Sequence, residues 1–440
     1  MSSCICPECN QDYSGYGWCK PCNSKHFQND FNNWTSGNDK IDKLIQDVQL
    51  NANDYNKVIE WIPYDRFIDV KQIGKGGFGT IHYARWIDGY IGEWDIENQQ
   101  WNREEEEVAL KKFDSFVNFS DVLNEIEIHL KTNKAYSYVS IRFYGITQDP
   151  ETHSYMMVLQ YAEDGNLREY LKTNFNNINW ERKLYKLYSL SYRLMNIHEL
   201  DIVHQDFHPG NILSSNFKGS NIMQISDFGL SKLIGANPNN PEKKNIFGVL
   251  PYIAPEVLSG DEEYTKAADV YSFGIIAYEI VTGFPPYPDI PHDKDLAMKI
   301  CNGLRPKIPF HIPKLITRTI MRCWDARVTH RPTFTELWNE SYKYYKDYCY
   351  YFNEGRNKDS EIVIQIKKAE EFSENQESTN TTTPLNYQTH PQAIYTSRLL
   401  NYSNLPKPKN EENFERELEE LTKSTSALSI VASKLHVPDF

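Results

Sequence analysis

Two short segments near the middle of the chain constrain its fold and chemistry most strongly. The stretch HQDFHPGNIL at 204–213 contains Asp206 and Asn211, and ISDFGL at 225–230 contains Asp227. Carboxylate and amide oxygens are the ligands that magnesium prefers, and a carboxylate can also accept a proton from a reacting hydroxyl. The order of these three side chains therefore suits a site that binds a metal ion and accepts a proton.

A glycine-rich stretch, IGKGGFGTI at 73–81, lies between two strand-like segments and contains G-x-G-x-x-G. Glycines let backbone N–H groups approach phosphate oxygens and permit the backbone angles of a hairpin tip. Dinucleotide-binding folds use the same spacing, but there a helix follows, and an acidic residue about 20 positions on. This chain continues instead into an acidic, Trp-rich insertion, which favours a phosphate-binding hairpin.

Further segments follow in a definite order. EEVALKKF at 106–113 and YMMVLQYAEDGNL at 155–167 are typical of apolar strands, and FSDVLNEIEIHLK at 119–131 has helical periodicity. IAPEVL at 253–258 and CWDARVTHRPTF at 323–334 flank an apolar stretch that reads as a buried helix starting near Asp269. Any one of these segments could arise by chance, but their shared order could not.

Together these segments resemble a eukaryotic protein kinase, most closely of the tyrosine-kinase-like group. The resemblance covers about residues 64–343 and implies an α+β, two-lobed fold. The small lobe, 64–162, would be an antiparallel β lobe with a regulatory helix, and the large lobe, 163–343, would be mainly helical. The resemblance also implies ATP and Mg²⁺.

The resemblance assigns a lysine and a carboxylate of the small lobe to phosphate binding. The alternation in Val-Ala-Leu-Lys selects Lys111, rather than the neighbouring Lys112, as the lysine that contacts the α- and β-phosphates. Glu125 would hold this lysine in position. Glu127 is an alternative, but two residues further along a helix it would face away.

The resemblance also assigns the residues of the two central segments. Asp206 would accept the proton of the substrate hydroxyl, and Asn211 and Asp227 would bind the magnesium ions. Arg331 would pair with Glu256 of the Ala-Pro-Glu segment. Lys111, Glu125, Asp206, Asn211 and Asp227 are then the catalytic set.

Nucleotide binding is assigned to the glycine-rich stretch and to the strand that leads to the hinge. Leu159 would be the gatekeeper, and the backbones of Gln160 and Ala162 would bond the adenine edge. The complete predicted set for ATP is Ile73, Gly74, Lys75, Gly76, Gly77, Phe78, Gly79, Ile81, Ala109, Lys111, Leu159, Gln160, Ala162 and Leu213.

Two departures from the family pattern concern activation. Gln205 stands where the family usually has an Arg that pairs with a phosphorylated activation loop, and a neutral Gln cannot make those charge-assisted bonds. Between Asp227 and Glu256 the only hydroxyl residues are Ser231 and Tyr252, both close to the ends of the segment. We therefore expect activity that does not depend on activation-loop phosphorylation.

Two further departures concern the substrate. His208 and Val249 stand where serine/threonine kinases usually have Lys and Thr, yet the tyrosine-kinase pattern is not matched either. HPGN is nearer to the serine/threonine form Lys-Pro-Glu-Asn, so serine/threonine specificity is the interpretation that we adopt. The alternative is a nucleotide-binding pseudokinase that serves as a signalling scaffold.

The first 36 residues form a Cys-rich segment. Cys6, Cys9, Cys19 and Cys22 have the spacing C-x2-C-x9-C-x2-C, which lets two small turns face each other around one tetrahedral zinc ion. Unpaired thiols are the alternative, and Cys4 and His26 are spare candidate ligands. The segment would stabilise the protein or bind a protein partner.

Residues 37–63 are predicted to contain an amphipathic linker helix, because Ile41, Leu44, Ile45 and Val48 recur at helical spacing. We expect it to pack on its neighbour; binding of a partner is the alternative. The acidic run REEEE at 103–107 reads as a solvated loop. Trp86, Trp94 and Trp101 are expected to cover the small lobe.

Residues 344–440 form a tail with a different composition. Its segment ENQESTNTTTPLNYQTHPQ has too few apolar residues to offset the entropy of ordering, so the tail is predicted to be largely disordered. Phe414, Leu418, Leu421 and Leu428 suggest one weak helix near its end. Tail and zinc segment are both candidate protein-binding elements.

Overall composition limits the partners and the location. The formal net charge is -13, and without a basic run the chain is not expected to bind nucleic acid. No apolar run approaches the length of a membrane span. The start, MSSCICPECN, lacks the features of a secretory signal, so a cytoplasmic or nuclear location is expected.

Overall fold

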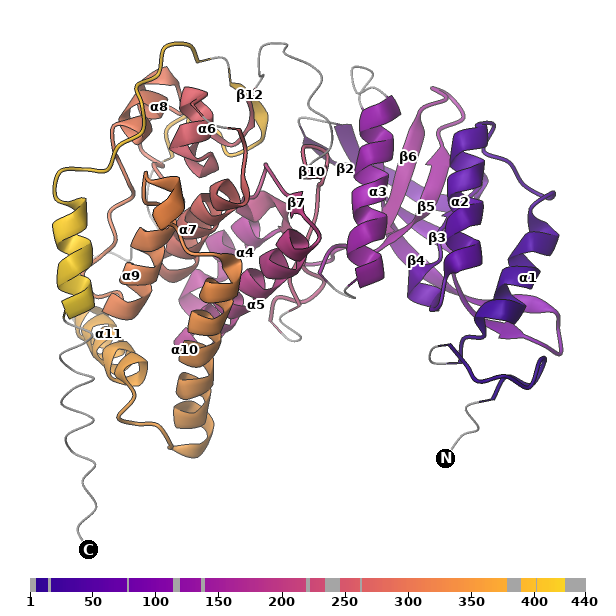
Figure 1. Ribbon diagram of the computed structural model, residues 1–440, viewed down its shortest axis with the longest axis horizontal. Coiled ribbons are helices and arrows are strands. Elements are labelled where there is room, and N and C mark those ends of the chain that lie inside the picture. Colours follow the sequence, from indigo (N-terminus) through magenta and orange to yellow (C-terminus); the bar gives the residue numbers. More distant parts are fainter. Residues whose placement is uncertain are drawn as a thin grey trace, which may run out of the picture. The chain divides into compact units, whose positions relative to one another are not determined.

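The computed structural model in Figure 1 describes residues 5–14, 17–76, 79–113, 119–135, 139–218, 222–233, 246–261, 263–377, 389–400 and 402–423. These residues form two compact units, Met1–Glu163 and Asp164–Phe440. Several residues singled out in the sequence lie outside the described ranges, namely Cys4, Gly77, Phe78 and Leu428.

The first unit is built on one six-stranded sheet with the strand order β1-β5-β6-β4-β3-β2. All neighbouring strands are antiparallel except β1 and β5, which run parallel. The strands are β1 (Glu60–Trp61), β2 (Phe67–Gly76), β3 (Gly79–Asp95), β4 (Gln100–Phe113), β5 (Phe143–Gln148) and β6 (Tyr155–Gln160). The helices of this unit are α1 (Lys20–Asp30), α2 (Asp39–Asn51) and α3 (Phe119–Ala135).

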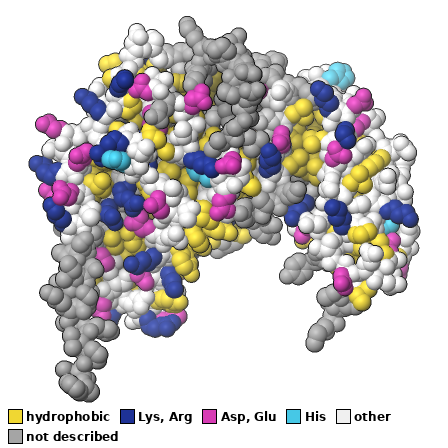
Figure 2. Space-filling model, in the orientation of Figure 1, with side chains coloured by type: hydrophobic (Ala, Val, Ile, Leu, Met, Phe, Trp, Pro, Cys, Tyr) yellow, Lys and Arg dark blue, Asp and Glu magenta, His cyan; other side chains and the backbone are white. Residues whose placement is uncertain are grey.

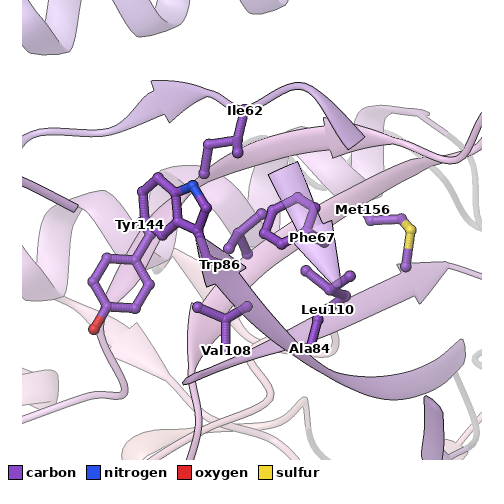
Figure 3. Close-up of a cluster of buried hydrophobic side chains, with 9 residues drawn as sticks. Ile62, Phe67, Ala84, Trp86, Val108, Leu110, Tyr144 and Met156 are labelled. Carbon is purple, nitrogen blue, oxygen red and sulfur yellow. The ribbon is translucent and has the colours of Figure 1, made fainter. Parts of the chain in front are cut away.

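A cluster of buried side chains on one face of the sheet fixes the register of β4 (Figure 3). Val108 and Leu110 lie in this cluster with Trp86 of β3. Because side chains alternate between the two faces of a strand, Lys111 must point to the opposite face. A slip by one residue would expose the apolar set, so the cluster also determines where Lys111 points.

The acidic run at 103–107 is part of strand β4 and not the solvated loop that the sequence suggested. It pairs with β3, which extends from Gly79 to Asp95, so the insertion is a long β-hairpin. The acidic charge of this run could not distinguish a loop from a strand, because the exposed face of a paired strand tolerates acidic side chains as well as a loop does. Trp86 is buried in the sheet cluster, as expected.

The Cys-rich segment packs against the far end of this hairpin. Trp18 and Phe27 form a buried cluster with Ala52, which follows α2, and Ile91 of β3, and Trp101 of β4 stacks on both aromatic rings. Helix α2 follows the cap residue Asn38, and Ile41 and Ile45 of α2 are fully buried. The segment that precedes the sheet is therefore an integral part of the first unit.

The second unit is mainly helical. Its central helix, α7, is buried on all sides, as expected for an almost wholly apolar sequence. The helices are α4 (Leu167–Asn174), α5 (Trp180–Glu199), α6 (Pro255–Ser259), α7 (Lys266–Thr282), α8 (Lys294–Cys301), α9 (Lys314–Cys323), α10 (Phe334–Glu354) and α11 (Glu361–Glu377). An antiparallel β sheet and a mainly helical unit together confirm the predicted α+β, two-lobed fold.

Three short antiparallel strand pairs complete the second unit and connect its loops. Strand β7 pairs with β10, β8 with β9, and β11 with β12. Their bounds are β7 (Ile202–Val203), β8 (Ile212–Leu213), β9 (Gln224–Ile225), β10 (Lys232–Leu233), β11 (Ile246–Gly248) and β12 (Arg398–Leu400). The first two pairs hold the segments that carry Asp206, Asn211 and Asp227.

The described residues of the tail are ordered against the second unit, in contrast to the predicted disorder. Helix α11 buries Ile362, Val363 and Ile366, strand β12 joins β11, and residues 414–423 are helical with Phe414 buried. Figure 1 draws β12 beside α6 and α8, far from it in sequence. Amino-acid composition could not predict that these residues are ordered, because a few buried apolar side chains and backbone hydrogen bonds hold them in place. Most of the polar segment, at 378–388, lies outside the described residues.

The surface charges are mixed. Figure 2 shows Lys and Arg side chains interspersed with Asp and Glu side chains over the visible face of the described residues. A continuous basic stripe, which nucleic-acid binding would use, is not seen on that face. Within the described part of the chain, no helix has both the length and the apolarity that crossing a bilayer requires.

A buried ion pair connects distant parts of the second unit. Arg331 binds Glu256 through two bonds, Nη1 to Oε1 and Nη2 to Oε2, each 2.7 Å long. Both side chains are almost completely shielded from solvent. The structure thus joins the two residues that the sequence paired.

Replacing Arg331 with Met should lower the free energy of unfolding by about 3–5 kcal/mol, because it leaves the Glu256 carboxylate buried without a partner. The matched control is Arg356→Met, which removes an exposed pair with Glu354 and should cost less than about 1 kcal/mol. Urea titration of both variants measures the difference. Equal losses would contradict the importance of the buried pair.

Candidate active site

In the first unit, Lys111 and Glu125 form a buried ion pair. Lys111 Nζ lies 2.6 Å from Glu125 Oε1, and the two side chains are only 5% and 1% exposed. Lys111 comes from β4 and Glu125 from α3, so sheet and helix must pack correctly for the pair to form. The pair holds a cation at a defined point on the sheet face opposite the Trp86 cluster.

The two competing residues make other contacts. Lys112 points to the other face of β4 and binds Asp149. Glu127 is exposed and pairs with Lys131 on its own helix, at a distance of 2.9 Å. Lys111 and Glu125 are therefore the lysine and glutamate that contact each other, whereas Lys112 and Glu127 have other partners.

Most of the residues assigned to the nucleotide lie on four strands of the first unit. Ile73, Gly74, Lys75 and Gly76 end β2, and Gly79 and Ile81 begin β3, with Gly76 paired to Gly79 across the hairpin. Ala109 of β4 pairs with Leu159 of β6, and Gln160 ends that strand with its N–H bonded to the Arg142 carbonyl. Ala162 is buried just beyond β6, and Leu213 lies in β8 of the second unit.

Gly79 is required by a close backbone approach. A Cβ atom at this position would lie 2.1 Å from the Lys112 carbonyl oxygen of the adjacent strand. Any side chain would push β3 away from β4, so this glycine preserves the pairing that carries Lys111.

In the second unit, the Asp269 carboxylate holds the start of the segment 204–213 in place. Its Oδ2 accepts hydrogen bonds from the His204 N–H at 2.9 Å, and its Oδ1 accepts from the Gln205 N–H at 3.2 Å. His198 Nε2 lies 2.9 Å from Oδ2. Gln205 has a φ of 67°, an unfavourable region for a residue with a side chain, so the segment needs such external bonds.

Asp206 and Asn211 lie next to each other at the end of this segment. Asn211 Nδ2 donates to the Asp206 backbone carbonyl at 2.9 Å and lies 3.5 Å from Asp206 Oδ2. The bond through Nδ2 leaves the amide oxygen as the acceptor atom of Asn211. Both residues are almost completely buried.

Asp227 is held near these residues by the pairing of β8 with β9. Ile212, which follows Asn211, pairs with Ile225, and the Ser226 N–H donates to the Asn211 carbonyl at 3.0 Å. Asp227 has a φ of 61°, a strained backbone conformation of the kind found at functional sites. The backbone pairing of β8 with β9 thus places Asp227 one residue beyond Ser226, which is bonded to the Asn211 carbonyl.

His204 connects the two segments as a neutral ring. Its Nε2 lies 3.1 Å from the Ser226 carbonyl, and its Nδ1 accepts a bond from the Asp206 N–H at 3.4 Å. Burial lowers the pKa of His204, which keeps the ring neutral near pH 7. A neutral ring with the proton on Nε2 satisfies both contacts.

Both hydroxyl residues between Asp227 and Glu256 are buried. Ser231 Oγ donates to the His204 carbonyl at 2.9 Å. The Tyr252 hydroxyl donates to Glu279 Oε2 at 2.5 Å and accepts from Arg168 Nη2 at 2.8 Å. In this conformation neither hydroxyl is accessible for modification.

The sequence reasoning missed two features of the site. Asp269 was noted only as a helix start, and nothing in the sequence linked it to Gln205. Ser397 was not singled out among the hydroxyl residues of the tail, yet it contacts both Asp206 and His208. No local sequence signal could have found this contact, because nearly two hundred positions separate the partners.

The four cysteines of the N-terminal segment form a compact cluster. Their Sγ atoms all lie within 4.8 Å of one another, with Cys6 to Cys22 at 3.9 Å and Cys9 to Cys19 at 3.5 Å. Tetrahedral Zn–S bonds of about 2.3 Å would place the sulfurs about 3.8 Å apart, so this donor set fits zinc. His26 lies outside the cluster, where it pairs with Glu8 and stacks on Trp94.

Comparison with known proteins agrees with this geometry. A family model described as protein tyrosine and serine/threonine kinase matches residues 68–340. The chain therefore belongs to the protein kinase family.

Individual relatives are distant. The chain is 28% identical over 277 residues to the tyrosine-protein kinase SPK-1 of Girardia tigrina, covering 61% of this chain and 51% of that protein. It is 28% identical over 308 residues to the probable serine/threonine-protein kinase pats1 of Dictyostelium discoideum, covering 68% and 9%. It is 29% identical over 278 residues to the putative serine/threonine-protein kinase/receptor R831 of Acanthamoeba polyphaga mimivirus, covering 63% and 16%. The match thus spans about half or less of each relative.

Replacing Asp269 with Ala should lower the free energy of unfolding by at least about 3 kcal/mol, because three donors, two of them buried, lose their acceptor. The control Asp261→Ala changes an exposed carboxylate and should alter stability by no more than about 0.5 kcal/mol. Urea titration measures both. A change in Asp269→Ala as small as in the control would contradict the anchoring role.

Proposed function

We propose that this protein is an ATP- and magnesium-dependent protein kinase that transfers the γ-phosphoryl group of ATP to serine or threonine hydroxyls of proteins. In the transfer, the hydroxyl oxygen bonds to the γ-phosphorus, the bond to the β,γ-bridging oxygen breaks and ADP leaves. Asp206 takes the proton of the hydroxyl. Lys111 holds the α- and β-phosphates.

The observation that carries the proposal is the buried Lys111–Glu125 pair. A lysine and a carboxylate at 2.6 Å with almost no exposure are costly to bury, and apolar residues could fill the same space with no loss of stability. A protein kinase needs this pair in place for catalysis. The Lys111–Glu125 pair is already formed in this structure, which supports a catalytic protein rather than a scaffold.

Asn211 and Asp227 are the proposed magnesium ligands. Oxygen donors suit this hard cation, and the Nδ2 bond of Asn211 to the Asp206 carbonyl turns the amide so that its oxygen can serve as ligand. Bound magnesium would neutralise charge on the phosphates. The protein's own part is to keep these oxygens and Asp206 in one rigid arrangement.

Independence from activation-loop phosphorylation forms part of the proposal. Two observations support it: Gln205 replaces the usual Arg, and both Ser231 and Tyr252 are buried. A segment without a phosphate receptor and without an accessible hydroxyl must reach its active conformation by other contacts.

Serine/threonine specificity and membership of the tyrosine-kinase-like group are the finer parts of the proposal. Two of the three relatives described above are named as serine/threonine kinases and one as a tyrosine kinase. His208 and Val249 match neither pattern completely. Phosphoamino-acid analysis of a labelled generic protein substrate should find phosphoserine or phosphothreonine; phosphotyrosine alone would refute this part.

Phosphatase-treated protein should phosphorylate a generic protein substrate in the presence of Mg²⁺ and ATP without prior activation. Lys111→Met should lower the rate at least about a hundredfold, whereas the control Lys112→Met removes only the contact with Asp149 and should keep activity within a few-fold of the wild type. Radiolabel transfer measures the rates.

Asp206→Asn serves as the inactive reference in the same assay. If the dephosphorylated wild type transfers no more phosphate than Asp206→Asn, while still binding ATP, the protein is a nucleotide-binding pseudokinase. Activity that appears only after treatment with another kinase would refute independence from activation-loop phosphorylation.

For the Cys cluster we propose structural zinc. The donor set and the sulfur separations support it, and so does the position of the cluster beside the buried Trp18. Holding the two turns together would keep the Trp18–Trp101 contact, and with it the β3–β4 hairpin, in place. The zinc site would stabilise the protein or bind a partner, and it would take no part in phosphoryl transfer.

Purified protein should contain one zinc per chain by elemental analysis. The double variant Cys9→Ser, Cys22→Ser should contain almost none and should unfold at a lower temperature, because structural zinc contributes directly to folding. The control Cys349→Ser alters a cysteine outside the cluster and should keep the metal. Less than half a zinc per wild-type chain would contradict the proposal.

A further inference from the structure

The tail contains a segment, residues 389–400, whose last three residues form a strand added to β11 of the activation segment, the stretch between Asp227 and Glu256; we call residues 389–400 the acceptor segment. Its strand β12 pairs antiparallel with β11, with Arg398 opposite Gly248 and Leu400 opposite Ile246. Addition of a strand to an exposed edge is a general way for proteins to bind extended peptides. Here the peptide belongs to the same chain.

Contacts on both sides hold the acceptor segment in place. The His292 N–H donates to the Gln392 carbonyl at 2.9 Å, and the Tyr395 hydroxyl donates to the Pro286 carbonyl at 2.8 Å. The Arg168 guanidinium lies 4.5 Å from the centre of the Tyr395 ring. Leu400 is buried in the hydrophobic cluster formed by residues of α6 and α8.

The segment delivers one hydroxyl to the catalytic carboxylate. Ser397 lies immediately before β12, and its Oγ donates a hydrogen bond to Asp206 Oδ2. Asp206 is the residue that takes the proton from the acceptor hydroxyl in the proposed function. Of the hydroxyl residues nearby, Thr396 is exposed and Tyr395 is bonded to Pro286.

His208 completes the environment of this hydroxyl. Its Nδ1 accepts the Gly210 N–H at 3.0 Å, so the neutral ring carries its proton on Nε2. Nε2 lies 3.2 Å from Ser397 Oγ and can therefore donate to it. The Ser397 oxygen thus accepts from His208 and donates to Asp206, which leaves one lone pair for attack on phosphorus.

We propose that Ser397 is the site of intramolecular autophosphorylation, with the acceptor segment as a substrate built into the chain. This inference rests on the proposed function. The Ser397 oxygen bonds to the γ-phosphorus of ATP, the bond to the β,γ-bridging oxygen breaks, ADP leaves and the hydroxyl proton passes to Asp206. His208 holds the oxygen in position by its hydrogen bond.

The product changes the electrostatics of the same site. Phosphoserine carries about -1.5 to -2 charges at pH 7, and here it would lie against the buried Asp206 carboxylate. Repulsion between like charges then displaces the acceptor segment from β11. The segment therefore occupies the substrate position only until Ser397 is phosphorylated, and external proteins reach Asp206 afterwards.

The first test follows phosphorylation of Ser397 in the phosphatase-treated full chain. After addition of Mg²⁺ and ATP, peptide mass spectrometry should find phosphate on Ser397, with a first-order rate constant that stays the same over a hundredfold range of protein concentration. Thr396→Ala should not change that rate constant. A rate constant that rises in proportion to concentration would overturn the intramolecular assignment.

A mixing experiment gives an independent answer. The Asp206→Asn chain, incubated with the wild type, should remain unphosphorylated at Ser397 while the wild type becomes modified. Equal labelling of both chains would show transfer between molecules and overturn the proposal.

A second pair of variants tests the strand geometry without touching the catalytic residues. Leu400→Asp places a charge in the buried cluster and should slow phosphorylation of Ser397 about tenfold or more, since it removes the apolar contact that holds β12. Leu399→Asp alters the neighbouring side chain, which is 42% exposed, and should leave the rate within about twofold of the wild type. Equal effects of the two variants would contradict the inference.

The same samples separate this inference from the proposed function. Leu400→Asp should phosphorylate an added generic protein substrate at least as fast as the wild type does. If added substrate is labelled but Ser397 stays unmodified in the wild type, the inference alone fails. If neither added substrate nor Ser397 is labelled, the proposed function fails and the inference fails with it.

Discussion

The second unit depends on one buried carboxylate, that of Asp269. It accepts two consecutive backbone N–H groups, from His204 and Gln205, and contacts the His198 ring. Gln205 can keep its positive φ only because these bonds hold it there. The loop conformation in turn fixes Asp206, so the position of the proposed catalytic base depends on a residue of α7 that touches no substrate.

The first unit depends in the same way on the packing of its sheet. The Trp86 cluster sets the register of β4, and that register alone decides that Lys111 rather than Lys112 meets Glu125 of α3. The long β3–β4 hairpin connects this sheet to the Cys-rich segment through Trp101. A change at the Cys cluster can therefore reach the sheet through packed aromatic side chains.

The residues that depart from the family pattern make contacts in the structure that fit one common interpretation. A neutral Gln205 needs no phosphate, and the hydroxyls of Ser231 and Tyr252 are both bonded inside the protein. His208, in place of the usual Lys, is placed to hold the Ser397 oxygen. Control of this protein is thus better sought in the tail than in the activation segment.

The sequence by itself determined the family and the α+β fold, and it supplied the proposed catalytic residues, because these rest on short motifs with fixed chemistry and spacing. Tertiary structure alone decided that Asp269 supports the loop and that Ser397 meets Asp206. Those contacts join positions far apart in the chain, and their residue types are common. For the same reason composition predicted disorder for a tail that is ordered wherever the structure describes it, since a few buried residues such as Leu400, together with backbone hydrogen bonds, suffice to fix a strand.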